Sequence, residues 1–407
     1  MPLELLDPLA GPKVDEKDYL WTLNFGPQHP ATHTTLRLIL TLDGETVVRA
    51  VPDIGYLHSG FEKLGEDLDF NQYVTIADRK NYISPLANEI AWHHAVEKLL
   101  GVELTPRCKY LRTICAELMR LSDHLLCIGA VALDLGGFTA FIYGFIEREK
   151  IYDIVEQASG QRYHTSFTRV GGMQYDVGDD WIAKVREFVR GFPKAYADIT
   201  RLLNKNRIFI ERTKGIGYLS KEDAINGGAT GPVARASGVV RDVRKDEPYL
   251  AYKDFDFKVA CSTAGDCYAR YIVRMREMEE SIKIIEQAIE NLPAGPLNLD
   301  FAGKATLPDK KAVYRSIEGL IQHFEIIMPN RGVPAPVEEV YAATESPNGE
   351  LGYFIVSDGK HRAYRARTRP PSFIHFSLFP QLIEGHQVSD VVAVLGSLNI
   401  IAAELDR

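Results

Sequence analysis

The chain has 407 residues, of which 45% are hydrophobic and 25% are charged, so it is long enough to bury a large globular core. Its net charge is −8 and its sequence pI is about 5.8, and it has no dense lysine and arginine stripe interleaved with aromatic residues. This composition argues against nucleic-acid binding.

The two ends of the chain predict no targeting or membrane-spanning segment. Residues 1–7 lack the basic-then-apolar order of a secretory signal and the arginine-rich pattern of a transit peptide. The longest nearly apolar run, 391–403, is interrupted by Gly396, Ser397 and Asn399 and is shorter than the roughly 20 residues needed to cross a bilayer. We therefore expect a bacterial cytoplasmic chain that meets a membrane only through partners.

The N-terminal region has the alternation of a β-hairpin. Leucines occupy every second position up to a turn at Asp43-Gly44, and a further strand-like segment begins at Thr46. This pattern predicts paired strands within residues 19–51 that bury one face. The alternating leucines are Leu36, Leu38, Leu40 and Leu42.

Helical periodicity replaces this alternation after Gly60. Apolar residues recur three and four positions apart, most clearly over 111–132 and 269–291, as in helices that bury one stripe. Pro193 predicts a kink or a break in another helix, because proline removes an amide donor. The stripes favour helices packed in a bundle. The predicted helices cover residues 111–132, 138–156, 181–203, 269–291 and 309–326.

Strand patterns return in the last third of the chain. Residues 351–356 and 362–367 predict a second hairpin, which is followed by a proline-rich bend at 369–371. A short terminal helix is expected to begin near Ser389 or Asp390.

The predicted fold is α+β, with a central helical bundle and small antiparallel β elements near both ends. We expect three parts: a β-hairpin unit at 1–60, a helical core at 61–330, and a β element with a terminal helix at 331–407. The glycine pairs at 171–172 and 215–217 lack the strand, glycine-rich turn and helix of a dinucleotide site.

The cysteines do not form a recognisable metal or redox motif. Their number is odd, and no pair has the C-x-x-C spacing of a structural zinc or redox site. Reduced thiols in the core are therefore expected. The five residues are Cys108, Cys115, Cys127, Cys261 and Cys267.

The most unusual segment is the loop 26–33, which reads Gly-Pro-Gln-His-Pro-Ala-Thr-His. Its two prolines argue against a helical metal-binding face formed by His29 and His33. The histidine pair fits structural hydrogen bonding, part of a metal site, or proton transfer, since histidine titrates near neutral pH. The residue types alone leave these three alternatives open.

This loop and other segments along nearly the whole chain resemble the quinone-site subunit of respiratory complex I (the D or 49 kDa type), a family related to the nickel-iron hydrogenase large subunit. The resemblance implies a hydrogenase large-subunit-like fold. Besides 26–33, the matching segments are 54–63, 95–101, 133–136, 160–164, 169–172, 235–238, 350–353 and the terminal 406–407.

In the related hydrogenases, two C-x-x-C motifs hold the metals through soft thiolates. The four corresponding positions here are Asn81, Ser84, Ile401 and Glu404. Isoleucine has no ligand atom and the other three are hard or weak ligands, so the resemblance implies that the nickel-iron centre is lost. No metal or cluster is expected on this chain itself.

The resemblance implies that a quinone head group, as substrate, occupies this region instead. Its reduction consumes two electrons and two protons, so the protein must present hydrogen-bond donors. By motif match these are Tyr82 and His33, whose phenol and imidazole can donate to the carbonyl oxygens. Asp134, in the Leu-Asp-Leu-Gly turn, is then expected to hold His33 in its donor form.

Two further positions, Arg79 and His164, match residues that face the terminal iron–sulfur cluster of a neighbouring subunit and tune its potential. Because this chain has no cluster-binding cysteine pattern, the 4Fe-4S cluster is expected in a partner. Ser59 replaces an arginine of some family members, so nothing attributed to that arginine carries over. No role is assigned to His93, His94, His124, His323, His361, His375 or His386.

The function that the resemblance implies is that of a subunit of a proton-pumping NADH:quinone oxidoreductase, active only within the complex. Expected partners are the iron–sulfur B subunit and the C subunit, with the membrane-arm A and H subunits near the quinone channel, while NAD and FMN bind other subunits. The expected location is the cytoplasmic face of the bacterial inner membrane.

Three alternatives remain at this stage. The first is the equivalent subunit of a related complex that takes electrons from ferredoxin or a deazaflavin. The second is a non-catalytic scaffold that keeps the hydrogenase-like fold. The third is an active hydrogenase, against which the missing thiolates argue.

Overall fold

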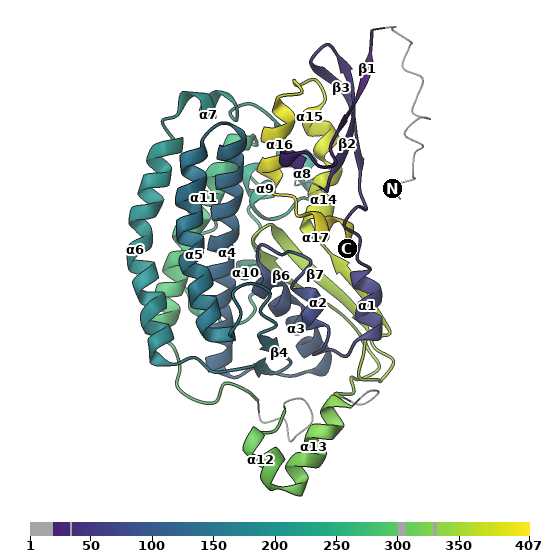
Figure 1. Cartoon of the computed structure of the whole chain (residues 1–407), viewed down its shortest axis with the longest axis vertical. Helices are drawn as coiled ribbons and strands as arrows, with labels where there is room; N and C mark the ends of the chain where they lie inside the picture. The colour runs from purple at the N-terminus through teal and green to yellow at the C-terminus, as the bar shows by residue number, and fades with distance from the viewer. Residues whose placement is uncertain (1–18, 33–34, 300–306, 329–331) are drawn as a thin grey trace.

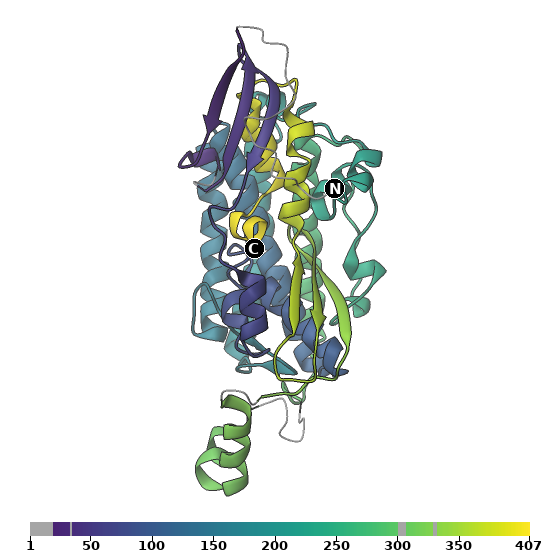
Figure 2. The same ribbon diagram turned by 90° about the vertical axis from the view of Figure 1, so that its right-hand side faces the viewer.

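The computed structural model describes residues 19–32, 35–299, 307–328 and 332–407. In Figure 1, long helices stand side by side on one side of the molecule, and sheets with short helices cover the other side. Figure 2 shows the first sheet above the C-terminal sheet in this second layer. A helical bundle with small antiparallel sheets confirms the predicted α+β class.

The N-terminal sheet consists of β1 (Trp21–Phe25), β2 (Arg37–Asp43) and β3 (Thr46–Asp53), paired antiparallel in that order. The alternating leucines of 36–42 are all buried, which confirms the predicted hairpin and its buried face. The turn occupies Gly44 and Glu45, one residue later than expected.

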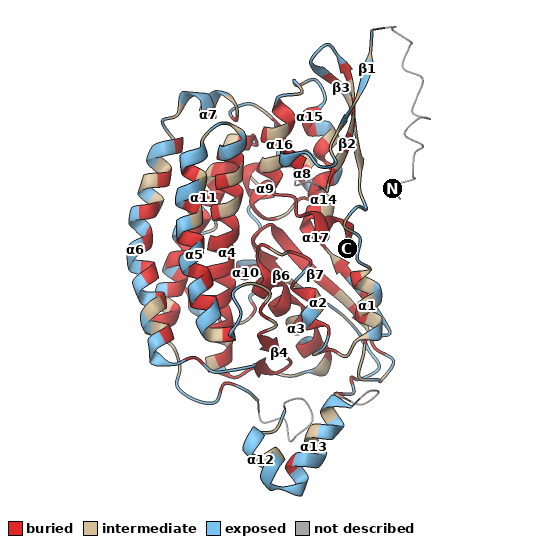
Figure 3. Ribbon diagram, viewed as in Figure 1, coloured by how far each residue is buried: buried red, intermediate tan, exposed pale blue. Residues whose placement is uncertain are grey.

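Four long helices form the bundle: α4 (Pro106–Asp134), α5 (Phe138–Ser159), α6 (Asp179–Leu203) and α11 (Cys267–Glu290). All four were predicted. Their apolar faces meet in the largest core cluster of the molecule, and Figure 3 shows these inward faces as buried.

Of the predicted kink or break at Pro193, the break is wrong, because α6 runs through the proline as one helix, and the kink stays a prediction. Trp181, Val185 and Phe188 are buried before the proline, and Ile199 is buried after it. Burial of the same stripe on both sides holds the helix together despite the missing amide donor.

The single helix predicted at 309–326 is two helices, α12 (Lys310–Arg315) and α13 (Ile317–Ile327). Ser316 between them is extended, and its hydroxyl accepts a hydrogen bond from the Gly319 amide at 3.0 Å, so it caps a new helix. This helix pair extends beyond the bundle at one end of the molecule (Figure 1).

The C-terminal sheet contains β6 (Glu339–Ser346), β7 (Gly349–Val356) and β8 (Arg365–Arg369), antiparallel in that order. The predicted hairpin of β7 and β8 is confirmed, whereas β6 was not anticipated. The sheet packs on α3 (Pro85–Leu100).

Short helices complete the C-terminal region. They are α14 (Pro371–Ser377), α15 (Phe379–Ile383), α16 (Asp390–Leu398) and α17 (Ala402–Asp406). The start of α16 confirms the helix expected near Ser389 or Asp390. Together with β2 and β3, α15 and α16 enclose one core cluster, so the two ends of the chain are packed together.

The remaining elements are short connections around these layers. They are η1 (Pro30–Thr32), α1 (Phe61–Asp67), α2 (Val74–Ala77), β4 (Thr168–Arg169), β5 (Gly172–Met173), α7 (Arg207–Glu211), α8 (Lys221–Asn226), α9 (Gly231–Ala236), α10 (Val243–Asp246) and η2 (Tyr252–Asp254).

Among the described residues, no helix is both long and apolar enough to cross a membrane. All five cysteines are free thiols, four of them buried and Cys261 partly exposed. The division of the chain into 1–60, 61–330 and 331–407 stays a prediction.

Candidate functional site

The loop before β2 is held close to that strand by a glycine. Gly26 has a φ of +84°, and a side chain there would meet the Leu36 carbonyl oxygen at 2.2 Å. The ring of His29 lies 4.4 Å from that of Phe25, centroid to centroid. Its Nδ1 accepts a hydrogen bond from the Ala31 amide at 3.1 Å, which assigns the ring proton to Nε2 in the neutral form.

Asp134 is the last residue of α4 and is exposed. Loss of hydration raises the pKa of its carboxyl group, and the charge of His29 partly opposes this rise. The loop therefore does approach Asp134, but the histidine seen there is His29. His33 lies outside the described residues, so its predicted role and its pairing with Asp134 stay predictions.

Tyr82 lies in the turn between α2 and α3 and is half-buried. Burial raises the pKa of its phenol, although a hydrogen bond with the backbone of Ala402 lowers it in part. Tyr163 lies close by, since the charges of Tyr82 and Asp123 both raise its pKa. The phenol thus contacts the start of α17 and lies near Tyr163.

His164 and Arg79 lie on either side of a buried carboxylate. Asp78 is fully buried, and its Oδ2 lies 3.4 Å from Nδ1 of His164. Arg79 follows Asp78 in the chain, is exposed, and donates from Nε to the Thr75 carbonyl at 3.2 Å. The two residues predicted to face a partner's cluster are therefore brought to the same region.

The predicted site residues fall into two groups. The charges of Tyr82 and of Asp123 on α4 both act on Tyr163, whereas Asp134 is 11 residues beyond Asp123 on the same helix. At 1.5 Å of rise per residue, this separation is about 16 Å along the helix axis. His164 lies with the Tyr82 group, and His29 lies with Asp134.

The four positions that carry thiolates in hydrogenases come from two segments that meet at Tyr82. Asn81 and Ser84 precede α3, while Ile401 and Glu404 lie at the start of α17. No set of three or more histidine, cysteine, aspartate or glutamate side chains in the described part of the chain is arranged to hold a metal ion. The side chains present therefore do not fit a nickel-iron centre.

Three of these positions are deeply buried polar residues, and the charges of two further buried residues act on Glu404. We call the five the underpaired cluster: Lys80, Asn81, Ser84, Asp123 and Glu404. Each side chain is at most 1% exposed. Four polar atoms among them have no protein partner. These atoms are Nδ2 of Asn81, Oγ of Ser84, Oδ2 of Asp123 and Oε1 of Glu404.

The charged groups of this cluster have pKa values shifted toward neutrality. Burial lowers the pKa of Lys80 to about 7, and its Nζ donates to the Thr368 hydroxyl at 2.6 Å. Burial raises the pKa of Glu404 to about 8 and that of Asp123 to about 6. The hydroxyl of Ser372 donates to the other oxygen of Glu404.

A second buried polar group lies deeper between α4, α9, α11 and β6, and we call it the paired network. Arg235 forms ion pairs of 2.8 Å with Glu277 and 2.7 Å with Glu345. Arg244 bridges Asp242 at 2.7 Å and Glu117 at 3.1 Å. The network comprises Glu117, Arg120, Arg235, Asp242, Arg244, Glu277 and Glu345.

Ion pairing outweighs burial for most carboxylates of the paired network. Burial alone would raise the pKa of Glu277, but Arg235 and the hydrogen bond from His124 at 2.8 Å hold it well below its usual range. Arginines likewise lower the pKa of Glu117 and Asp242, whereas burial raises that of Glu345. His124, to which no role was assigned, is thus a structural partner of this network.

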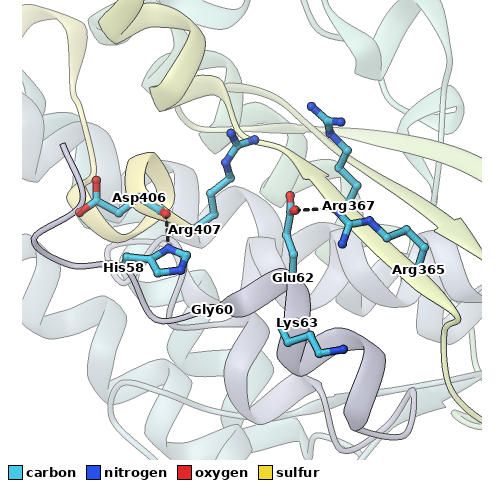
Figure 4. A pocket seen from close by; sticks show the side chains of 8 residues that line it. All are labelled: His58, Gly60, Glu62, Lys63, Arg365, Arg367, Asp406 and Arg407. Atoms are coloured by element: carbon cyan, nitrogen blue, oxygen red, sulfur yellow. Dashed lines mark hydrogen bonds and ion pairs between the residues drawn. The ribbon is translucent and has the colours of Figure 1, made fainter. Parts of the chain in front are cut away.

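A pocket of about 510 Å³ opens on the outer side of Lys80, between α1, β8 and the end of the chain. In Figure 4, His58 and Asp406 lie on one side of it and Glu62 approaches Arg365 on the other. The charges of Glu62 and Arg407 both act on the ammonium group of Lys80. Two residues that line this pocket are therefore within electrostatic reach of the underpaired cluster.

Sequence reasoning missed Lys80, Asp123 and Ser372 and treated Glu404 only as a lost ligand. A lysine two residues before Tyr82 was visible in the sequence, but its complete burial was not. The proximity of Asp123 to Glu404 joins positions 281 residues apart, which no spacing rule predicts.

The family model for the 49 kDa subunit of respiratory-chain NADH dehydrogenase matches residues 134–407. The NADH-quinone oxidoreductase D subunit of Methylacidiphilum infernorum is 47% identical over 95% of this chain and 91% of its own. A D-type subunit of the same enzyme from Sinorhizobium medicae is 46% identical over 99% of both chains. The D subunit of Akkermansia muciniphila is 47% identical over 95% and 92%.

These similarities extend over nearly the whole length of the chain. The chain therefore belongs to the 49 kDa subunit family of the respiratory-chain NADH dehydrogenase, complex I, and is a subunit of a multi-subunit oxidoreductase.

Proposed function

We propose that this chain forms the protein half of the quinone head-group site of complex I, with Tyr82 and His33 as hydrogen-bond donors to the two carbonyl oxygens. Two electrons reach the quinone from the iron–sulfur cluster of a neighbouring subunit, and two protons complete its reduction to the quinol. Asp134 orients the histidine side of this site.

The observation that carries the proposal is the setting of Tyr82. Its phenol is anchored at the start of α17 and keeps its proton, because burial raises its pKa above the ordinary value. A protonated phenol can donate a hydrogen bond to a quinone oxygen and deliver a proton as negative charge develops there. The neighbouring side chains cannot hold a nickel-iron centre, so the position is open to an organic substrate.

The setting of His164 supports a role beside the partner's cluster. Its imidazole lies 3.4 Å from the buried carboxylate of Asp78, which fixes its place beside this segment. Polar and charged groups near an iron–sulfur cluster tune its reduction potential. Arg79, which follows Asp78 in the chain and is exposed, adds a positive charge to the same region.

The assembly that follows from this proposal places the iron–sulfur B subunit against the Tyr82 side, with the C subunit and the membrane-arm A and H subunits nearby. NAD, FMN and the 4Fe-4S cluster belong to other subunits. The complex acts at the cytoplasmic face of the bacterial inner membrane and pumps protons, and the chain alone shows no turnover.

The test is Tyr82→Phe in membranes that contain the whole complex. The NADH:quinone reductase rate should fall by about 100-fold or more, because a positioned proton donor contributes about that factor. Electron transfer from NADH to an artificial acceptor should stay unchanged, since it reports only the steps upstream of the quinone.

Tyr218→Phe provides the matched control, because this tyrosine is 60% exposed. It should leave both rates at the wild-type value. Full quinone reductase activity in Tyr82→Phe membranes would remove the phenol from the reaction and favour a scaffold. Membranes that reduce quinone with ferredoxin but not with NADH would instead indicate the related complex with another electron donor.

A further inference from the structure

The underpaired cluster lies directly behind Tyr82. Lys80 and Asn81 immediately precede the tyrosine, and Glu404 is two residues beyond Ala402, whose backbone binds the phenol. Buried polar atoms in proteins are almost always hydrogen-bonded, and a group of atoms without protein partners indicates ordered water. The four unpartnered atoms of this cluster therefore indicate ordered water beside Glu404, two residues from the Ala402 backbone that binds the phenol.

Glu404 is surrounded by groups from four segments. The hydroxyl of Ser372 on α14 binds one carboxyl oxygen. Asp123 on α4 opposes ionisation of Glu404, whereas Lys80 in the turn before α3 favours it. On β7, the charge of Glu404 raises the pKa of the Tyr353 phenol. Because burial dominates, the carboxyl has a pKa of about 8 and carries its proton at neutral pH.

We propose that Glu404 is the internal proton donor that restores the phenol of Tyr82 after the phenol has given its proton to the reduced quinone. This inference rests on the proposed quinone site and adds the source of the proton.

The proton balance of the step is simple. The O–H bond of Tyr82 breaks as its proton moves to a quinone oxygen that has received electrons from the partner's cluster, which leaves a tyrosinate. The proton of the Glu404 carboxyl then moves through the bridging water to the tyrosinate oxygen, which leaves a carboxylate. That carboxylate regains a proton from solvent on the side of the pocket in Figure 4.

The second transfer is energetically downhill. The pKa of the Tyr82 phenol is raised above its ordinary value of 10.0, whereas the pKa of Glu404 is about 8. A proton therefore moves spontaneously from the carboxyl to the tyrosinate, and the donor is present at neutral pH. Lys80 is a positioning residue here, since its charge lowers the pKa of Glu404 without contacting the quinone.

The pH dependence follows from these values. Glu404 holds its proton below pH 8 and loses it above pH 8, so the quinone reductase rate should fall as the pH rises through about 8. Lys80 has a pKa of about 7 and is largely neutral at pH 8, so removing it should leave the fall close to its wild-type pH.

The experiment compares Glu404→Gln and Lys80→Met in membranes containing the whole complex. Glu404→Gln keeps the shape of the side chain and its bond to Ser372 but has no acidic proton. We expect about a tenfold or greater loss of quinone reductase at pH 7, loss of the alkaline fall, and an unchanged artificial-acceptor rate. Lys80→Met should retain the alkaline fall near pH 8, because the amine is already largely neutral there.

A spectroscopic readout separates proton donation from a structural role. Infrared difference spectra of the complex on quinone reduction should contain the carbonyl band of a protonated carboxyl, and Glu404→Gln should lack it. Glu187→Gln, at an exposed position on α6, is the matched control and should retain the band, the rate and the pH profile.

The proposal is overturned if assembled Glu404→Gln complex keeps the wild-type rate and alkaline fall, or if Lys80→Met abolishes the fall and so identifies the lysine as the titrating group. Those results would leave the quinone site itself intact, because that site depends on Tyr82→Phe. If Tyr82→Phe loses quinone reduction and Glu404→Gln keeps the wild-type rate, the proposed function stands and Glu404 is rejected as the proton source.

Discussion

The underpaired cluster and the paired network are equally buried, yet their charged groups behave in opposite ways. Arg235 and Arg244 are at most 2% exposed, and each meets at least two carboxylates. Lys80 and Glu404 are equally buried, but neither forms an ion pair within the described residues. Lys80 has the Thr368 hydroxyl and the face of the Tyr353 ring, whose centroid is 4.4 Å from Nζ. Glu404 has the Ser372 hydroxyl.

The two groups differ in how far ion pairs compensate for the free-energy cost of burying charge. Burial penalises every charge, and close ion pairs with hydrogen bonds can offset that penalty. In the paired network the arginines keep most carboxylates ionised at all ordinary pH values. In the underpaired cluster the penalty is not offset, so the same kinds of group titrate near neutral pH. Pairing, more than burial, therefore separates a structural polar core from one that can exchange protons.

The largest effect that this comparison predicts is that of Arg235→Met. The substitution leaves Glu277 and Glu345 buried without their cation, which should cost about 3–5 kcal/mol of folding stability. The assembled complex should disappear from native gels of the membranes. A normal amount of complex with wild-type thermal stability would show that the pairing in this network is dispensable.

Lys80→Met should have the opposite effect, a gain in folding stability. In the folded chain the amine has a pKa of about 7, well below its value in the unfolded chain, so folding penalises the protonated lysine at and below neutral pH. An apolar side chain of similar length avoids this penalty and should stabilise by about 1–4 kcal/mol.

The measurement for Lys80→Met is the fraction of complex that survives heating at pH 6 and at pH 9. The gain over wild type should be larger at pH 6, where the full penalty on the buried ammonium group is present. At pH 9 the folded amine is neutral, so folding only releases a proton, and that release costs less as the pH approaches the pKa of the unfolded lysine. A loss of stability at both pH values would contradict the contrast between the two regions.

The smallest effects come from a matched pair of serines. The hydroxyl of Ser281 donates to Glu117 of the paired network at 2.6 Å, so Ser281→Ala should cost about 1–3 kcal/mol. The hydroxyl of Ser84 has no protein partner, so Ser84→Ala should change stability by less than about 1 kcal/mol. Thermal inactivation of the complex measures both, and equal losses would mean that Ser84 is paired in the assembly.

Much of the architecture followed from local patterns in the chain. Period-two leucines predicted the hairpin of β2 and β3, and apolar stripes predicted α4 and α11, because burying one face requires that spacing. Local patterns predicted the ends of helices wrongly where tertiary packing or capping opposed the local preference. Pro193 does not break α6, since both of its flanks are buried, and Ser316 ends one helix only because its hydroxyl caps the next.

Residue types alone were enough to indicate the family and the loss of metal ligands, because motifs and missing thiolates can be read along the chain. Motif match also named Tyr82, Asp134, Arg79 and His164. Which of these lie together, and what surrounds them, depends on the tertiary structure. The reason is physical: the pKa of Glu404 depends on burial and on Asp123 and Lys80, which approach it from distant parts of the chain.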